Sequence, residues 1–461
     1  MMKTVVLVNP PARQVVIRDY FCSKVSQATY INPPVDFVCL SGRLAEHFDV
    51  RLVDAVVQKL DPAACRARIQ ALNPHAVVGL TGFVSWREDA AFYASLDLPV
   101  VLLGDILLEN TEQRLRDNPW ADAFALDFTT DDLVRFLRGD RDRLKNFAYR
   151  RNGQVVHPTH IRDAGRVFEI PLPRHDLFTP LDYRYPFVMG RPFATMLTEY
   201  GCPFKCEFCI MGRLGHKVRP VDNVIPELDA LHAAGVRDIF FADQTFASDR
   251  SRALRLLDAL MHYRPRLRWL CFSRVDRADA DLLPAMKRAG CHTVIYGIES
   301  ADDALLRDYK KGTTQTQIRD TFRAARACGV RTVGTLLFGL PGDSPASCER
   351  TIAFVKTIPC DFISVNIAVP RMGTPLRERA VHSGLVPETL DHMDQSGTFI
   401  AMESGDFTAS ELQRLKKKAL RAFYLNAPYA ARRLRGVRSL QQLGIEARQG
   451  VSLLRNFLKG G

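Results

Sequence analysis

The first 138 residues alternate short, unbroken apolar runs with longer segments of helical spacing. The apolar runs lie at residues 5–9, 49–55, 76–83, 99–105 and 122–128. Segments between them, such as 62–73, repeat apolar residues at the intervals of an amphipathic helix. Strands that are apolar on both faces are typical of a parallel sheet covered by helices on both sides. Residues 1–138 are therefore predicted to form a flavodoxin-like, doubly wound α/β domain.

The pattern changes between residues 139 and 190. Asn152-Gly153 separates two short alternating runs, which predicts a β-hairpin. Residues 169–187 are rich in proline and show no period. This stretch is predicted to be a hairpin and linker between two domains.

From residue 191 the alternation of strand-like and helix-like segments resumes. The apolar runs lie at residues 193–200, 237–243, 267–273, 292–300, 331–339 and 362–370. Each gap can hold one helix, as residues 314–329 illustrate. Six β/α units are fewer than the eight of a closed barrel. Residues 191–384 are therefore predicted to form a partial (β/α)6 barrel, followed by a helical region at 385–461.

Composition narrows the class of protein. A chain of 461 residues is expected to hold two or three domains. Its eleven cysteines are an odd number and mostly lie far apart, which favours a reduced, cytoplasmic protein over a disulfide scaffold. The chain begins with too short an apolar run for a signal peptide, and no run approaches the length of a membrane span.

The positive charge is concentrated at the end of the chain. From residue 411 onward there are twelve Lys or Arg and two acidic residues, a net charge of +10. The rest of the chain therefore carries only +2 of the total +12. Three interpretations stay open: a helical cap with a solvated basic face, a peripheral contact with an anionic membrane surface through residues such as Val451, Leu454 and Leu458, or a nucleic-acid contact. No aromatic platform or recognition motif supports the last one.

Three cysteines are clustered in the stretch TEYGCPFKCEFCIMGR, residues 198–213. Cys202, Cys206 and Cys209 follow the first barrel strand, at the end of the strand where barrel enzymes hold their active sites. A structural zinc site needs four ligands, and only His216 lies near enough in the sequence to complete one. Three thiolates suit a [4Fe–4S] cube instead, with one iron left open to another ligand.

The C-x3-C-x2-C spacing at the end of the first strand of a six-unit barrel resembles the radical S-adenosylmethionine (SAM) superfamily. The closest resemblance is to the cobalamin-binding subgroup, which is related to the anaerobic magnesium-protoporphyrin ester cyclase and to radical methylases. The resemblance implies that the open iron of one [4Fe–4S] cluster binds SAM. An electron from the cluster then splits the sulfonium and releases a 5′-deoxyadenosyl radical.

The same resemblance assigns further residues to the SAM site. The residues that the resemblance assigns to this site are Phe208 beside the adenine, Asp243 in FADQTF, Arg274 for the SAM carboxylate, Glu299 in YGIES, and Gly339 in FGLPGD. Gln244 replaces a second acid of the family segment. An ion pair with Asp276 is the alternative role of Arg274. The segments KKGTT and VPRMGTPL also match the subgroup.

The resemblance places cobalamin at the carboxyl edge of the first sheet, the usual ligand position in open α/β sheets. The candidate contacts are small or turn-forming residues: Asn9, Pro10, Thr81, Gly82 and Gly104. The sequence lacks the D-x-H-x-x-G signature that supplies an axial histidine in some cobalamin proteins. The alternative is a degenerate domain retained for packing or for binding substrate.

These observations predict a radical SAM enzyme that methylates an unactivated carbon with the help of cobalamin. The resemblance also implies a small, hydrophobic biosynthetic intermediate as substrate and a low-potential electron donor as partner. A first alternative is a radical SAM enzyme without cobalamin that catalyses oxidation, cyclisation or rearrangement. A second is a nucleic-acid-binding protein with a zinc ion or a cluster.

Overall fold

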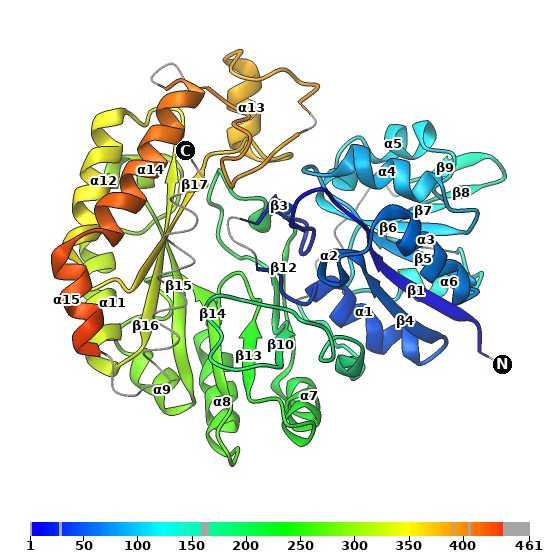
Figure 1. Ribbon diagram of the computed structural model, residues 1–461, viewed down its shortest axis with the longest axis horizontal. Helices are drawn as coiled ribbons and strands as arrows, with labels where there is room; N and C mark the ends of the chain where they lie inside the picture. The colour runs from blue at the N-terminus through cyan, green and yellow to red at the C-terminus, as the bar shows by residue number, and fades with distance from the viewer. Residues whose placement is uncertain are drawn as a thin grey trace.

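The computed structural model describes residues 2–26, 30–142, 144–157, 166–390, 392–403 and 407–436. These residues form two α/β units that lie side by side in Figure 1. The first unit is blue and cyan, and the second runs from green to orange. The sequence-based prediction of an α/β fold with a doubly wound domain and a partial barrel is confirmed. The division of the chain at residues 138, 190 and 384 stays a prediction.

The first unit is built on a seven-stranded sheet. Five parallel strands are followed by two antiparallel ones, in the order β4 (Asp49–Asp54), β1 (Thr4–Asn9), β5 (Ala76–Leu80), β6 (Val100–Leu103), β7 (Ala123–Ala125), β8 (Phe147–Arg151) and β9 (Gln154–Val156). All five predicted runs form strands. The predicted hairpin at Asn152-Gly153 forms β8 and β9, which extend this sheet at its edge.

Both faces of the first sheet are covered, as its apolar strands predict. In β1, Val5 and Leu7 pack on one face, while Val6 and Val8 pack on the other. One face is covered by α1 (Val35–Ala45) and α6 (Asp132–Leu137). The opposite face is covered by α3 (Pro62–Ala71), α4 (Trp86–Ala94) and α5 (Thr111–Asp117), and the short α2 (Ala55–Gln58) follows β4.

The second unit is a six-stranded parallel sheet that curves into a partial barrel. Its order is β10 (Phe193–Met196), β13 (Asp238–Phe241), β14 (Arg268–Ser273), β15 (Cys291–Glu299), β16 (Arg331–Phe338) and β17 (Phe362–Ile367). Each strand matches a predicted run. Between and after the strands lie α7 (Val221–Ala233), α8 (Arg250–Met261), α9 (Leu283–Arg288), α10 (Asp303–Asp308), α11 (Gln315–Cys328), α12 (Pro345–Thr357) and α13 (Pro375–His382).

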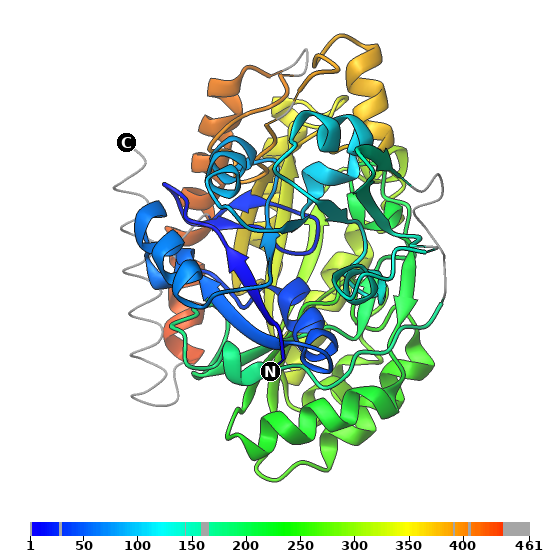
Figure 2. The ribbon, with the colours of Figure 1, turned by 90° about the vertical axis from the view of Figure 1, so that its right-hand side faces the viewer.

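The carboxyl ends of the two sheets face each other across one segment of chain. This β1–α1 segment, residues 10–26 and 30–34, contains the short strands β2 (Val16–Ile17) and β3 (Lys24–Val25). Figure 2 looks onto the first unit with the barrel behind it. The ion pair between Arg371 and Asp105, at 3.4 Å and almost fully buried, connects the barrel to the end of β6.

The region predicted to be helical, 385–461, contains two helices in its described part, whereas its described residues before Ala409 are turns and irregular chain. Helices α14 (Ala409–Tyr424) and α15 (Ala427–Gly436) run along the outside of the barrel beside α12 (Figure 1). Leu412, Leu415 and Phe423 of α14 are buried against the barrel. Val451, Leu454 and Leu458 lie outside the described residues. No described helix is both long and apolar enough to cross a membrane.

A buried ion pair closes the carboxyl edge of the first sheet. The Arg18 guanidinium donates to both carboxylate oxygens of Asp89, at 2.7 and 3.0 Å, and both side chains are fully buried. Arg18 also donates to the Asn9 side chain and to the Pro10 carbonyl, at 3.0 and 3.1 Å. Burial raises the pKa of Asp89, and the Arg18 charge opposes that rise. The β1–α1 segment is thereby fixed to the sheet.

Replacing Arg18 by methionine is expected to lower the free energy of unfolding by about 3–5 kcal/mol, because the Asp89 carboxylate stays buried without its partner. The loss should be smaller at pH 5 than at pH 8. In the variant the folded-state pKa of Asp89 lies further above the unfolded value, so the penalty grows as pH rises and the carboxyl must ionise. Urea denaturation at the two pH values measures both effects.

Arg13→Met is the matched control, since the Arg13–Glu88 pair is exposed. Its loss is expected to stay below about 1 kcal/mol at either pH. Equal losses in the two variants would contradict a role of Arg18 in fixing the segment.

Candidate active site

The chain leaves the first barrel strand through a turn that a buried carboxylate holds. Asp243 accepts hydrogen bonds from the backbone N–H of Thr198 and of Glu199, at 2.6 and 2.8 Å, and from the Thr198 hydroxyl. Burial and the nearby Glu199 charge raise the pKa of Asp243 to about 6. The structure does not bring this side chain to the cavity, although the sequence assigned it to SAM. Asp243 satisfies backbone donors that would otherwise be buried without partners.

The same turn is held from the other side by the first unit. The Tyr20 hydroxyl accepts a hydrogen bond from the Gly201 N–H at 2.7 Å and donates one to the Glu199 carbonyl at 3.1 Å. Gly201 has a φ of +68°, and a Cβ there would lie 1.8 Å from the Gly215 carbonyl oxygen. Glycine is therefore required directly before Cys202.

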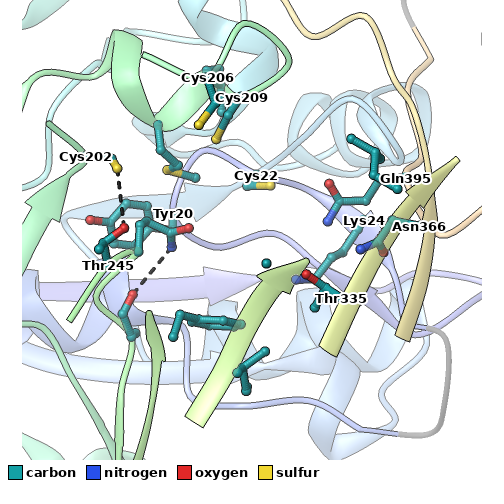
Figure 3. A pocket seen from close by; sticks show the side chains of 18 of the residues that line it. Tyr20, Cys22, Lys24, Cys202, Cys206, Cys209, Thr245, Thr335, Asn366 and Gln395 are labelled. Atoms are coloured by element: carbon teal, nitrogen blue, oxygen red, sulfur yellow. Dashed lines mark hydrogen bonds between the residues drawn. The ribbon is translucent and has the colours of Figure 1, made fainter. Parts of the chain in front are cut away.

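The three clustered cysteines line one cavity of about 290 Å³ between the two units (Figure 3). Cys202 Sγ lies 3.5 Å from the Thr245 hydroxyl, and Arg274 Nη1 lies 3.7 Å from Cys206 Sγ. All eleven cysteines of the chain are free thiols. The cavity is close in size to the smaller ligand pockets of proteins.

Three thiols suit a [4Fe–4S] cube with one open iron, whereas a structural zinc site uses four ligands. Among the described residues, no three His, Cys, Asp or Glu side chains converge closely enough to hold one metal ion. His216, the fourth ligand of the zinc alternative, contacts the Ser248 hydroxyl at 3.0 Å and is not among the lining residues.

Burial makes the Cys206 and Cys209 thiols weaker acids than usual. Burial, and then the neighbouring Cys206 and Cys202, raise the pKa of Cys209 to about 12. Burial also raises the pKa of Cys206, against the opposing charges of Lys311 and Arg274. The positive charge of iron would offset these effects, so cluster binding is expected to release protons.

Glu299 reaches the cavity through a local distortion of β15. Its backbone has a φ of +61°, and the pairing with β16 shifts register between Gly297 and Glu299. The carboxylate accepts a hydrogen bond from Lys311 Nζ at 2.9 Å. A Cβ on Gly297 would lie 2.2 Å from Glu299 Oε1 and 2.6 Å from Lys311 Nζ. The ion pair therefore needs glycine at 297, and such strained backbone is common at ligand sites.

Arg274 forms the ion pair that was the alternative to its predicted role at SAM, and it also lines the cavity. Its guanidinium forms the predicted ion pair with Asp276, through contacts of 2.9 and 3.0 Å. It also lies 3.9 Å from the centre of the Phe204 ring, and it donates to the Lys311 carbonyl at 2.7 Å. These contacts fix the guanidinium beside Cys206, where it lines the cavity.

The two other residues assigned to SAM behave differently. Phe208 lines the cavity, with its ring centre 6.3 Å from that of Tyr309. Gly339 does not line it. Its N–H donates to the Asp343 carboxylate at 3.2 Å, and a Cβ would meet Leu412 of α14 at 2.9 Å. Gly339 therefore allows α14 to pack closely against the barrel.

None of the five predicted cobalamin contacts lines the cavity. Asn9 and Pro10 bond to Arg18, and Thr81 donates to Asp89 at 2.9 Å. A Cβ on Gly82 would lie 2.2 Å from the Ser23 side chain, and one on Gly104 would lie 2.2 Å from the Thr81 carbonyl oxygen. The chain's own β1–α1 segment fills the edge that the sequence assigned to the corrin ring.

Residues that the sequence did not single out complete the cavity. From the β1–α1 segment come Asp19, Tyr20, Cys22, Lys24, Tyr30 and Asn32, and from the second unit come Thr245, Lys311, Thr335, Asn366, Arg371 and Gln395. Lys311 and Arg371 lie in KKGTT and VPRMGTPL, the two quoted segments that were given no role. No motif marked the β1–α1 residues, since their position depends on how two distant parts of the chain pack.

The comparisons with known proteins agree with this geometry. The family model for the radical SAM superfamily matches residues 196–355. The uncharacterized methyltransferase PH0819 of Pyrococcus horikoshii is 30% identical over 408 residues, covering 85% of this chain and 88% of that protein. The hopanoid C-2 methylase of Rhodopseudomonas palustris is 28% identical over 363 residues, covering 76% of this chain and 65% of that protein.

A solved structure shares the fold over nearly the whole chain. It is the radical SAM methyltransferase TsrM of Kitasatospora setae, with cobalamin and a [4Fe–4S] cluster bound. The TM-score is 0.68 at 17% identity, covering 98% of this chain and 99% of TsrM. At this identity the likeness establishes the shared architecture of the two units.

Changing Cys202, Cys206 or Cys209 to alanine is expected to abolish binding of a [4Fe–4S] cluster, because two thiolates leave a second iron without a protein ligand. Iron and sulfide analysis after anaerobic reconstitution, together with the visible absorption spectrum, measures the loss. Cys22→Ala is the matched control, since this thiol lines the same cavity. A full cluster in Cys206→Ala, or none in Cys22→Ala, would contradict the assignment.

Proposed function

This chain belongs to the radical SAM superfamily, and on that basis we propose that it is a cobalamin-dependent enzyme that methylates carbon in a small molecule. Members of the superfamily use a [4Fe–4S] cluster and SAM. The observation that carries the proposal is one cavity shared by both units, with three free thiols on the barrel side. The whole-chain similarity to a methyltransferase supports methyl transfer over other radical reactions.

The residues around the thiols are suited to seat SAM. The Glu299 carboxylate can accept hydrogen bonds from the SAM amino group, and Lys311 holds it in place. The Arg274 guanidinium offers a charged donor to the SAM carboxylate. Phe208 offers an apolar ring to the adenine. All four residues line the cavity beside the cysteines.

The first-unit wall of the cavity is where a corrin ring would be held. The residues there are Asp19, Tyr20, Cys22 and Tyr30. No histidine is among the described lining residues, which fits a cobalamin without an imidazole from the chain. When bound, the cluster supplies the electron that splits SAM, and cobalamin supplies the methyl group. The chain's own residues would hold these groups side by side in one cavity.

A second candidate is radical chemistry without cobalamin, giving oxidation, cyclisation or rearrangement. The observation that favours it is the filled carboxyl edge of the first sheet, where Ser23 occupies the space beside Gly82. In that case the first unit would act as a cover over the substrate. The two candidates differ in whether the purified protein retains a corrin.

Two further partners follow from the proposed chemistry and the charge of the chain. A low-potential electron donor is required to reduce the cluster. The outer face of α14 carries Arg414, Lys417, Lys418 and Arg421 along a shallow groove. The sequence after α14 is also rich in Lys and Arg, and together with this basic face it supports a peripheral contact with an anionic membrane surface.

Anaerobic reconstitution with iron, sulfide and hydroxocobalamin is expected to give a protein that retains corrin absorption after desalting. With SAM and a strong reductant it should form 5′-deoxyadenosine and, with substrate, S-adenosylhomocysteine. Absorption spectra and chromatography of the products measure this. A cluster and 5′-deoxyadenosine without a corrin would replace the proposal by its second candidate, and a protein that never cleaves SAM would overturn both.

Glu299→Gln is expected to raise the Kd for SAM by about tenfold to a hundredfold, because a hydrogen bond from a charged amino group to a carboxylate contributes about 1.5–3 kcal/mol. Iron content should not change. Isothermal titration of the cluster-loaded protein measures the Kd. Glu349→Gln, in an exposed pair with Lys418, is the matched control and should bind SAM normally. Equal affinity in both variants would remove Glu299 from the SAM site.

A further inference from the structure

Six charged side chains line the cavity, and five of them have partners. Glu299 pairs with Lys311, Arg274 pairs with Asp276, and Arg371 pairs with Asp105. The Asp19 carboxylate accepts a hydrogen bond from the Asn32 amide at 2.9 Å. The sixth is Lys24, whose ammonium makes no hydrogen bond or ion pair of 4 Å or less with any residue that the structure describes. An unpaired charge in a cavity is unfavourable unless a ligand or water compensates it.

Lys24 points from the first unit into the barrel. It lies in β3, and its side chain extends toward Thr335 of β16, Asn366 of β17 and Gln395 (Figure 3). The cysteine loop lies on the other side of the cavity in the same view. Burial lowers the pKa of Lys24, but Tyr30, Cys22 and Asp19 raise it above its usual value, so the ammonium stays charged.

The neighbours of Lys24 can act as neutral hydrogen-bond donors. The Gln395 side-chain oxygen accepts a hydrogen bond from Arg371 Nη2 at 3.2 Å. The NH2 group of Gln395 therefore points away from Arg371 and can donate to a ligand. The Thr335 hydroxyl donates to the Tyr296 carbonyl at a long distance of 3.4 Å, and this weak hydrogen bond can be exchanged for one to a ligand. One fixed cation flanked by such donors is a common arrangement for binding a carboxylate or a phosphate.

Four apolar side chains from the barrel strands also line the cavity. Phe240, Phe272, Ile295 and Leu337 line the same cavity on successive strands. The site thus offers a single charged corner and an apolar wall. Its shape and charge suit a molecule with one acidic group and an otherwise hydrophobic body.

We propose that Lys24, together with Gln395 and Thr335, binds an acidic group of the substrate and so sets its orientation under the cluster. This inference rests on the proposed function and deepens it, because it changes the expected substrate from hydrophobic to amphiphilic and anionic. The charged groups assigned to SAM lie beside the cysteines, whereas Lys24 lies on the opposite side of the cavity.

The test uses cluster-loaded protein saturated with SAM and hydroxocobalamin. Isothermal titration compares hexanoate, hexyl phosphate and hexanamide, which share one apolar chain and differ in charge. Hexanoate or hexyl phosphate is expected to bind at least tenfold more tightly than hexanamide. The better of the two anions identifies the acidic group as a carboxylate or a phosphate.

The variant Lys24→Met keeps the apolar stem and removes the charge. It is expected to bind the anion and the amide equally, while its Kd for SAM and its corrin content stay unchanged. Lys356→Met, on the exposed face of α12, is the matched control and should keep the preference for the anion.

Three results would overturn the proposal. One is an equal affinity for anion and amide in the unchanged protein. Another is a preference for the anion that survives Lys24→Met. The third is a loss of SAM or cobalamin in Lys24→Met, which would assign the lysine to a cofactor instead. These three results come from binding measurements, which do not need turnover. A failure of the Lys24 proposal can therefore be told apart from a failure of the proposed function, which would show as no S-adenosylhomocysteine.

Discussion

The site depends on how residues 198–201, just before the first cluster cysteine, are held from two sides. From inside the barrel, the Asp243 carboxylate accepts the backbone N–H groups of Thr198 and Glu199. From the first unit, the Tyr20 hydroxyl bonds to the backbone on both sides of Tyr200. A cube can bind only if its three thiols keep a fixed spacing. These hydrogen bonds fix the position of the backbone directly before Cys202, the first of the three cysteines. The two units therefore build one site jointly.

Charge around the cavity follows from the same arrangement. Parallel strands end at one edge, so side chains from several strand ends converge there. Glu299, Arg274 and Lys311 meet beside the thiols, and each has a partner that limits its motion. A preorganised set of charges can bind a zwitterion such as an amino acid group without large rearrangement. The strained backbone of Glu299 is consistent with such a fixed geometry.

Local pattern was enough to predict the strands and the cysteine loop. Each of the eleven apolar runs overlaps a strand of one of the two large sheets. The pattern was informative because a strand buried on both faces must be apolar at nearly every position. Spacing alone could not say where side chains point. Asp243 and Gly339 follow strands as expected. The Asp243 carboxylate, however, accepts hydrogen bonds from backbone N–H groups, and Gly339 leaves room for α14 to pack against the barrel. The sequence analysis missed Tyr20 and Lys24 because each acts on a part of the chain that is distant in sequence. Tyr20 bonds to Gly201, and Lys24 extends toward Thr335.

The buried Arg18–Asp89 pair has a consequence for how this architecture can change. It fixes the β1–α1 segment to the sheet at one end, while six residues beyond it form the roof of the cavity: Asp19, Tyr20, Cys22, Lys24, Tyr30 and Asn32. The sheet below therefore takes no part in choosing the ligand. A different roof requires changes in this segment but not in the sheet, provided that Tyr20 is kept to hold the turn before Cys202. The Arg18–Asp89 anchor of the segment is thus separate from the side chains of the segment that face the ligand.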